Sequence, residues 1–261
     1  MDLGPYDHYG YAFVALVGTF AAAWFLLWVT LRSRHAAAVA SFRGVSPPFL
    51  GVVGVLFALT LAFLANDTSN AHDRAVNSVV HEADSLSSVL ALAEGLPAAT
   101  RDKVVAAVRG YGRLAVDVEW PLLAERQASR AAADQLDGLL ALLAGEEVAH
   151  GLSPSTHALM LQQAIHVRET RAARIALSET HVNPLKWLSM AFLGFVTMIS
   201  IAMVHVEQPR AEILAVMLFA AAAAPTAAIV LVQANPFQRP TAVAPGPMAA
   251  IIDPAHFVGS R

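Results

Sequence analysis

Cysteine is absent from this chain of 261 residues, and charged residues are scarce. Without cysteine, disulfides and thiolate metal sites are excluded. Only 14% of the residues are charged and 56% are apolar, whereas an ordinary soluble domain carries about 25% charged residues. The small net charge of −3 gives no reason to expect a nucleic-acid partner. This composition is typical of a protein whose solvent is largely a lipid bilayer.

Four long apolar windows each approach the roughly 20 residues that cross a hydrocarbon core of about 30 Å. These windows are residues 11–31, 49–65, 185–206 and 211–232, and the fourth carries Glu212 only at its rim. The first window lacks the basic start and the small-residue cleavage site of a secretory signal, so we interpret it as a retained span. The sequence therefore predicts an integral membrane protein with four transmembrane helices.

A polar segment, residues 66–184, separates the second span from the third. Its apolar residues recur at helical spacing, and it contains no alternating run of β-branched residues, so we expect helices throughout. Breaks are expected at Gly95–Pro97, at Pro121 and at 151–154. No helix breaker precedes the first of these, so the second span is expected to continue as one long helix. The predicted fold class is all-α.

These patterns divide the chain into four parts. We expect transmembrane helices one and two in residues 1–65, a helical extramembrane domain in 66–184, and transmembrane helices three and four in 185–234. Residues 235–261 are rich in proline and glycine and are expected to form an irregular tail. The count of Lys and Arg near the span ends favours a cytoplasmic location for the helical domain and both termini.

The second span carries small and bulky residues on separate stripes. Glycine and alanine recur every three or four residues, a spacing that lets helices pack closely, at Gly51, Gly54, Ala58, Ala62 and Ala65. Beside them, Val55, Leu59 and Phe63 lie one above another at intervals of four residues. They have two interpretations: ordinary packing against lipid or helices, or a hydrophobic neck that gates a pore by excluding water.

Polar residues follow the second span at once. Asn66, Asp67 and Asn70 are interpreted either as a pore vestibule that attracts cations or as markers of the membrane interface. A second charged group comprises Arg168, Arg171 and Arg174. It is interpreted as a basic ring near a pore mouth or, in preference, as a solvated helix face with local ion pairs.

Chemistry-bearing motifs are missing from the sequence. We find no phosphate-binding glycine loop, no nucleophile elbow and no histidine pair on one face with an acidic partner. Glu82 and Glu119 lie among apolar residues, where pairing with arginines inside the helical bundle would neutralise them. The spans carry no evident buried ionisable residue, which disfavours an intramembrane enzyme and a proton-coupled transporter. We expect no metal, no cofactor and no enzymatic activity.

Four short motifs resemble the bacterial membrane family called bestrophin-like. In chain order they are LTLAF at Leu59–Phe63, HEADSL at His81–Leu86, EWP at Glu119–Pro121 and NPF at Asn235–Phe237. That family has two spans, a helical domain and two further spans, as predicted above. The chain departs from its pattern in lacking a tryptophan near Ser69 and in carrying Asn235 where an acidic residue is usual.

The resemblance implies a function. Bestrophins proper are pentameric ion channels whose second span lines a hydrophobic neck, and a Leu-Gly-Phe in that span is similar to Leu61–Phe63 here. It implies a homo-oligomer, with a pentamer favoured, that passively conducts ions across a bacterial inner membrane. Its partners would be further copies of the chain, the lipid bilayer and ions. The alternative is a non-conducting scaffold or a sensor that transmits a signal along its long helices.

Overall fold

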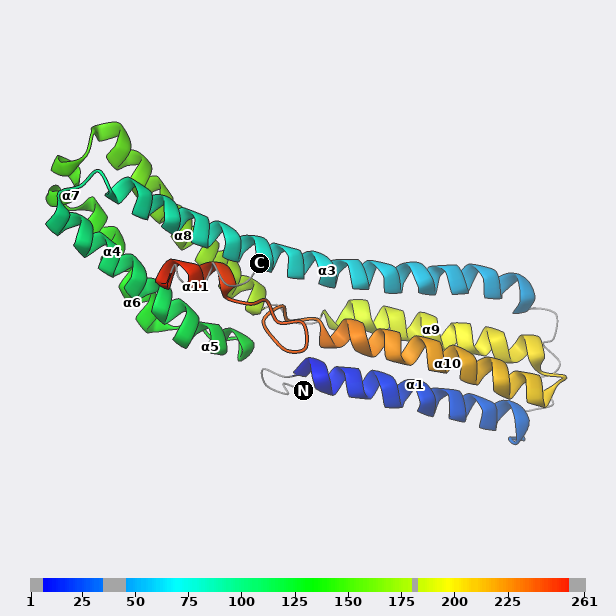
Figure 1. Cartoon of the computed structure of the whole chain (residues 1–261). Helices are drawn as coiled ribbons and strands as arrows, with labels where there is room; N and C mark the ends of the chain where they lie inside the picture. Colours follow the sequence, from blue (N-terminus) through cyan, green and yellow to red (C-terminus); the bar gives the residue numbers. More distant parts are fainter. Residues whose placement is uncertain (1–6, 35–45, 180–182, 254–261) are drawn as a thin grey trace. The chain divides into compact units, whose positions relative to one another are not determined.

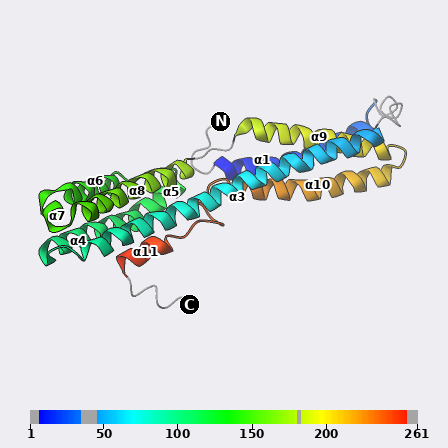
Figure 2. The same cartoon turned by 90° about the horizontal axis from the view of Figure 1, so that it is seen from above.

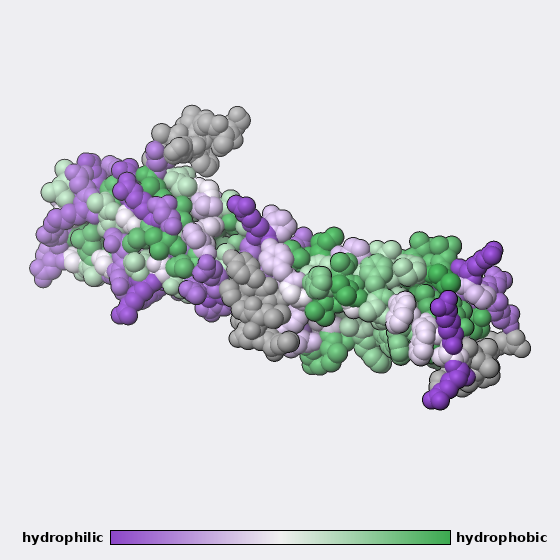
Figure 3. Space-filling model, turned by 90° about the horizontal axis from the view of Figure 1, so that it is seen from below, coloured by the Kyte–Doolittle hydropathy of each residue, from purple (hydrophilic) through white to green (hydrophobic). Residues whose placement is uncertain are grey.

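The computed structural model describes residues 7–34, 46–179 and 183–253, and no β-strand occurs among them. The chain divides into two compact units (Figure 1). The first comprises residues 1–70 and 181–234, and we call it the membrane unit. The second comprises residues 71–180 and 235–261, and we call it the polar unit. On the face in Figure 3, hydrophobic residues dominate the membrane unit and hydrophilic residues gather on the polar unit.

The membrane unit consists of apolar helices. They are α1 (Asp7–Leu31), the first part of α3 (Ser46–Ala93), α9 (Pro184–His205) and α10 (Pro209–Val232). Within the described residues, these four helices are long and apolar enough to cross a membrane. Figures 1 and 2 show α1, α9 and α10 side by side. The prediction of an all-α protein with four candidate spans is confirmed.

Small residues bring the membrane helices close together. Ala23, Ala202 and Ala220 are fully buried where α1, α9 and α10 meet. Helix α3 presents Phe57 and Leu64 to the same unit: Phe57 lies 5.4 Å from the Phe219 ring between centroids, and Leu64 clusters with residues of α9 and α10. One side of α3 is therefore packed against its own chain.

The polar unit is built around the second part of α3. Its other elements are α4 (Ala98–Arg113), a π-helix η1 (Leu114–Glu119), α5 (Trp120–Ala124), α6 (Arg130–Ala144), α7 (Glu146–Gly151), α8 (Pro154–Ser178) and α11 (Gly246–Ile252). Their apolar faces form one core. The Ser153 hydroxyl caps α8 by accepting a hydrogen bond from the Thr156 N–H at 3.2 Å.

The helix breaks agree with the sequence in two places and differ in one. Helix α3 is one helix of 48 residues that ends at Ala93, which confirms the predicted long rod. Pro121, however, does not interrupt its helix, which continues to Ala124. Proline lacks an N–H and its ring clashes with the carbonyl four residues earlier. The wider turn of η1 immediately before it accommodates both effects.

The C-terminal tail is not irregular throughout, because α11 forms within it. Proline is tolerated in the first turn of a helix, so the local sequence does not forbid this. Met248 and Ile251 on one face of α11 are buried in the core of the polar unit. Gly112 of α4 makes room for this contact, since a Cβ there would lie 3.1 Å from Ile252. Packing explains the helix where composition alone predicted irregular chain.

Candidate functional site

Within the described residues, the side of α3 opposite its packed face is uncovered. Val55, Leu59 and Phe63, the predicted neck, are 59%, 50% and 67% exposed. A helix turns by about 100° per residue, which places these three residues opposite Phe57 and Leu64. The structure thus brings the neck residues together on one uncovered apolar stripe.

The span of α3 is less buried by the rest of the chain than the other three spans are. Only 6% of its most apolar window is buried, against 17%, 33% and 28% for the spans of α1, α9 and α10. A Cβ added at Gly51 or Gly54 would meet no atom within 4 Å. The small residues of α3 therefore make no close contact with the chain's own helices at these positions, and the stripe is available to lipid or to another subunit.

Asn66, Asp67 and Asn70, the predicted vestibule, are all exposed at the polar end of this stripe. The Asp67 carboxylate pairs with the Lys186 ammonium of α9, with 2.7 Å between Oδ2 and Nζ. Both side chains are 55% exposed, so the pair is solvated. The lysine offsets part of the negative charge that the vestibule interpretation assigns to this end.

The three arginines of α8 do not form a common charged surface. Arg168 alone is solvated, and its guanidinium pairs with Asp137 at 2.8 Å. The Arg171 side chain is 13% exposed and that of Arg174 is fully buried. Both the basic-ring interpretation and the preferred solvated-face interpretation are wrong for Arg171 and Arg174. Side chains three positions apart on a helix point in directions that differ by about 300° around its axis. Two such steps are enough to place Arg168 at the surface and Arg174 in the interior.

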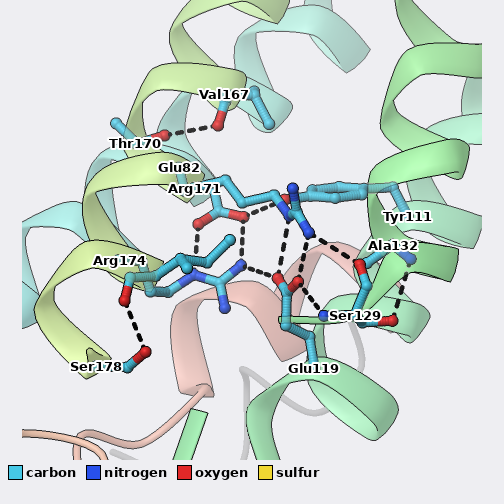
Figure 4. A network of polar contacts seen from close by, with 11 residues as sticks. Glu82, Tyr111, Glu119, Ser129, Ala132, Val167, Thr170, Arg171, Arg174 and Ser178 are labelled. Carbon is cyan, nitrogen blue, oxygen red and sulfur yellow. Dashed lines mark hydrogen bonds and ion pairs between the residues drawn. The ribbon is translucent and has the colours of Figure 1, made fainter. Parts of the chain in front are cut away.

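Arg171 and Arg174 instead enter a buried ion network in the polar unit (Figure 4). Arg174 donates from Nε to Glu82 Oε2 at 2.9 Å and from Nη2 to Glu119 Oε2 at 2.9 Å. Arg171 donates to both oxygens of Glu119, at 3.1 and 2.5 Å. The expected pairing of Glu82 and Glu119 with arginines is confirmed. Two guanidiniums and two carboxylates balance, so no net charge is buried.

Two further residues complete the network, and sequence reasoning does not single out either as a partner. The Tyr111 hydroxyl donates to Glu82 Oε1 at 2.5 Å, and the Ser129 N–H donates to Glu119 Oε1 at 3.0 Å. Tyr111 follows Val104 and Val108 on the inward face of α4, and a buried tyrosine hydroxyl needs a partner. The apolar spacing of Val104, Val108 and Tyr111 is therefore the sequence pattern that could have indicated a buried role for Tyr111.

The network also perturbs ionisation. Burial, and then repulsion by the Glu82 carboxylate, hold the pKa of Tyr111 well above its usual 10.0. Burial alone would lower the pKa of Arg174, but the Glu82 and Glu119 carboxylates outweigh burial and raise it. Tyr111 therefore stays a hydrogen-bond donor, and Arg174 stays charged. Its guanidinium carbon also lies 5.2 Å from the centroid of the Trp120 ring, a cation–π distance.

The expectation that the spans carry no buried ionisable residue is wrong. Glu212 lies in the first turn of α10, at the rim of the span as expected, but its side chain is fully buried. The argument against intramembrane proton chemistry rested on the absence of such a residue. Position along a helix shows how deep a residue lies but not which way it faces, and the chain here turns Glu212 inward.

The described residues offer little else for chemistry. An apolar cavity of about 290 Å³ in the membrane unit is lined by residues such as Gly18, Phe57 and Met198, with no titratable side chain among its lining. No group of three or more His, Asp or Glu residues that could hold a metal occurs in the part of the chain that the structure describes. The candidate functional site is therefore the bare stripe of α3.

These features define a multi-pass, all-helical membrane protein. A family model described as the Bestrophin-like domain matches residues 17–248, which is most of the chain. The chain therefore belongs to the bestrophin-like family. None of the curated proteins compared with the chain matches it.

Solved structures share this fold. A mutant of a bacterial bestrophin homologue from Klebsiella pneumoniae has a TM-score of 0.65 and 13% identity, covering 95% of this chain and 99% of that one. Another structure of a bestrophin homologue from K. pneumoniae has a TM-score of 0.62 and 14% identity, covering 91% and 94%. A third, described only as a membrane protein, has a TM-score of 0.64 and 14% identity, covering 92% and 95%. At these identities the likeness concerns the fold alone.

Proposed function

We propose that this protein is a homo-oligomeric ion channel that conducts ions passively and has no enzymatic activity. The single observation that carries the proposal is the bare apolar stripe of α3, the least covered of the four candidate spans. Membership in the bestrophin-like family gives the stripe a context, because the resemblance of the sequence to bestrophins implies a pore lined by the second span.

The chemistry of the stripe suits a neck. Val55, Leu59 and Phe63, repeated around a symmetry axis, would form three successive apolar rings. Water in a narrow apolar ring loses hydrogen bonds, so such rings block ions without closing sterically. Glycines and alanines beside them would allow neighbouring copies of α3 to approach closely. A pentamer is the assembly that the resemblance favours.

The polar end of the stripe would form the vestibule. Asn66 and Asn70 offer uncharged polar groups to an ion that leaves the lowest ring, and the Asp67–Lys186 pair contributes charges of both signs. The vestibule would open toward the cytoplasm, with the polar unit and both termini on that side of a bacterial inner membrane. Lysine and arginine counts near the span ends support this orientation.

A flux assay on liposomes tests the neck. Replacing Leu59 and Phe63 together with serine should raise ion flux several-fold, because hydroxyl groups let water wet the rings. The matched control replaces Phe192, which is 64% exposed on α9, with serine. Phe57 packs against Gly194 and Leu64 clusters with Met190, so Phe192 lies at a similar depth to the neck residues.

The control should leave flux unchanged, since Phe192 lies on α9 and not on the helix proposed to line the pore. Unchanged flux in the Leu59 and Phe63 double variant, with its oligomer intact by size-exclusion chromatography, would contradict the pore assignment. The outcome would then favour the alternative of a non-conducting scaffold or signal-transmitting sensor.

A further inference from the structure

One buried glutamate has no hydrogen-bond partner among the described residues. Both carboxylate oxygens of Glu212 are buried without a donor in the structure. It belongs to the first turn of α10, and Figure 1 shows that α10 begins at the end of the membrane unit where α1 and α9 end. The two buried carboxylates of the polar unit, Glu82 and Glu119, differ from Glu212 because arginines neutralise both of them. Within the part of the chain that the structure describes, Glu212 has no such cation.

The neighbours of Glu212 come from two other helices. Thr30 of α1 and His205 of α9 lie close to its carboxyl. The one hydroxyl hydrogen of Thr30 is directed to the carbonyl oxygens of Leu26 and Leu27, at 3.1 and 3.3 Å. Among the described residues, His205 is the titratable group found to interact with Glu212, while Glu207 and Arg210 nearby are exposed.

His205 is oriented to exchange protons. Its Nδ1 lies 3.0 Å from the carbonyl oxygen of Ile201. A carbonyl only accepts hydrogen bonds, so Nδ1 carries the hydrogen and Nε2 is left to take up or release a proton. The imidazole is half-buried, whereas the Glu212 side chain is fully buried. His205 is therefore close to the Glu212 carboxyl and still accessible to water.

The ligand that suits this carboxyl is a proton. An unpaired carboxylate buried away from water costs far more than a neutral acid. Calcium or magnesium needs about six or more oxygen ligands, and the described residues hold no group of three His, Asp or Glu that could bind a metal. We propose that Glu212 is a proton-binding site, supplied from water through Nε2 of His205. The site is independent of the pore proposed for α3.

Dicyclohexylcarbodiimide tests the proposal, because this apolar reagent modifies protonated carboxylic acids and spares carboxylates. Full-length protein in liposomes is treated across a range of pH, digested and analysed by mass spectrometry. We expect an adduct on Glu212 that declines as the pH rises, and none on Glu82 or Glu119. His205→Gln should move the pH at which labelling is half-complete, since it removes the titratable neighbour.

Infrared spectroscopy covers the case in which the reagent fails to reach the site. Glu212→Gln is nearly isosteric and should remove one protonated-carboxyl C=O band that the unmodified protein shows. A protein with neither an adduct on Glu212 nor a band that depends on Glu212 would overturn the proposal. Equal labelling of Glu212 and the arginine-paired Glu82 and Glu119 at every pH would overturn it too.

Discussion

The two parts of α3 belong to one continuous helix but meet different surroundings. In the membrane unit, Leu59 is 50% exposed. In the polar unit, Leu86 on the same helix is fully buried, and so is Glu82 beside it. In the polar unit, other helices of the same chain cover α3, and the buried arginines and glutamates balance one another in charge. The membrane part leaves its apolar stripe to be covered from outside the chain, by lipid or by further copies.

The largest effect should follow from breaking the ion network of the polar unit. Arg174→Gln removes the cation that pairs with Glu82 and one of the two cations that pair with Glu119. Leaving these carboxylates buried without that charge should lower the free energy of unfolding by about 3–5 kcal/mol. Urea unfolding of the full-length protein in detergent, followed by tryptophan fluorescence, measures this loss. Arg168→Gln is the matched control on the same helix, and its solvated pair is worth about 0–1 kcal/mol. Equal losses in both variants would contradict the buried network.

Two leucine substitutions compare the parts of α3 directly. Leu86→Ala should destabilise the protein by about 2–5 kcal/mol, because it leaves a cavity in a filled core. Leu59→Ala removes no contact of comparable burial and should stay within about 0.5 kcal/mol in detergent. The same unfolding assay measures both. If Leu59→Ala cost as much as Leu86→Ala in a monodisperse single chain, the stripe would not be bare.

Tyr111→Phe should cost about 1.5–3 kcal/mol, the value of a hydrogen bond to a charged group. It should also change the response to alkali. The folded pKa of Tyr111 is raised above 10.0, its usual value. Its stabilising contribution is therefore complete below pH 10 and is lost as the pH rises above it. Unfolding at neutral pH and at about pH 11 should show a smaller further loss for the variant than for the unmodified protein.

The smallest effect is expected at the exposed pair of Asp67 and Lys186. Lys186→Gln should change the free energy of unfolding by about 0–1 kcal/mol, because a solvated pair gains little. In liposomes, however, it should raise cation permeability relative to anions by leaving Asp67 uncompensated. Reversal potentials under a salt gradient measure the ratio. An unchanged ratio, or a shift toward anions, would show that the Asp67 charge does not act on the conducted ion.

Local signals predicted much of this structure. Apolar length predicts the four spans, and the break expected at Gly95–Pro97 lies just beyond the end of α3 at Ala93. The ion network lay beyond such signals, since Arg174 and Glu82 are 92 positions apart and only packing brings them together. The burial of Glu212 and the helix in the tail were missed for the same reason, because neighbouring elements decide both. The neck assignment stays a prediction.

The central claim, that the bare stripe of several α3 helices faces a common axis, is tested most directly by cross-linking. The chain contains no cysteine, so Leu59→Cys introduces a single thiol into each copy. Mild oxidation of this variant in liposomes should produce covalent dimers, because a narrow neck brings equivalent side chains together. Phe192→Cys, at a similar depth on α9, should stay monomeric under the same conditions. Dimers from Phe192→Cys with none from Leu59→Cys would contradict the account.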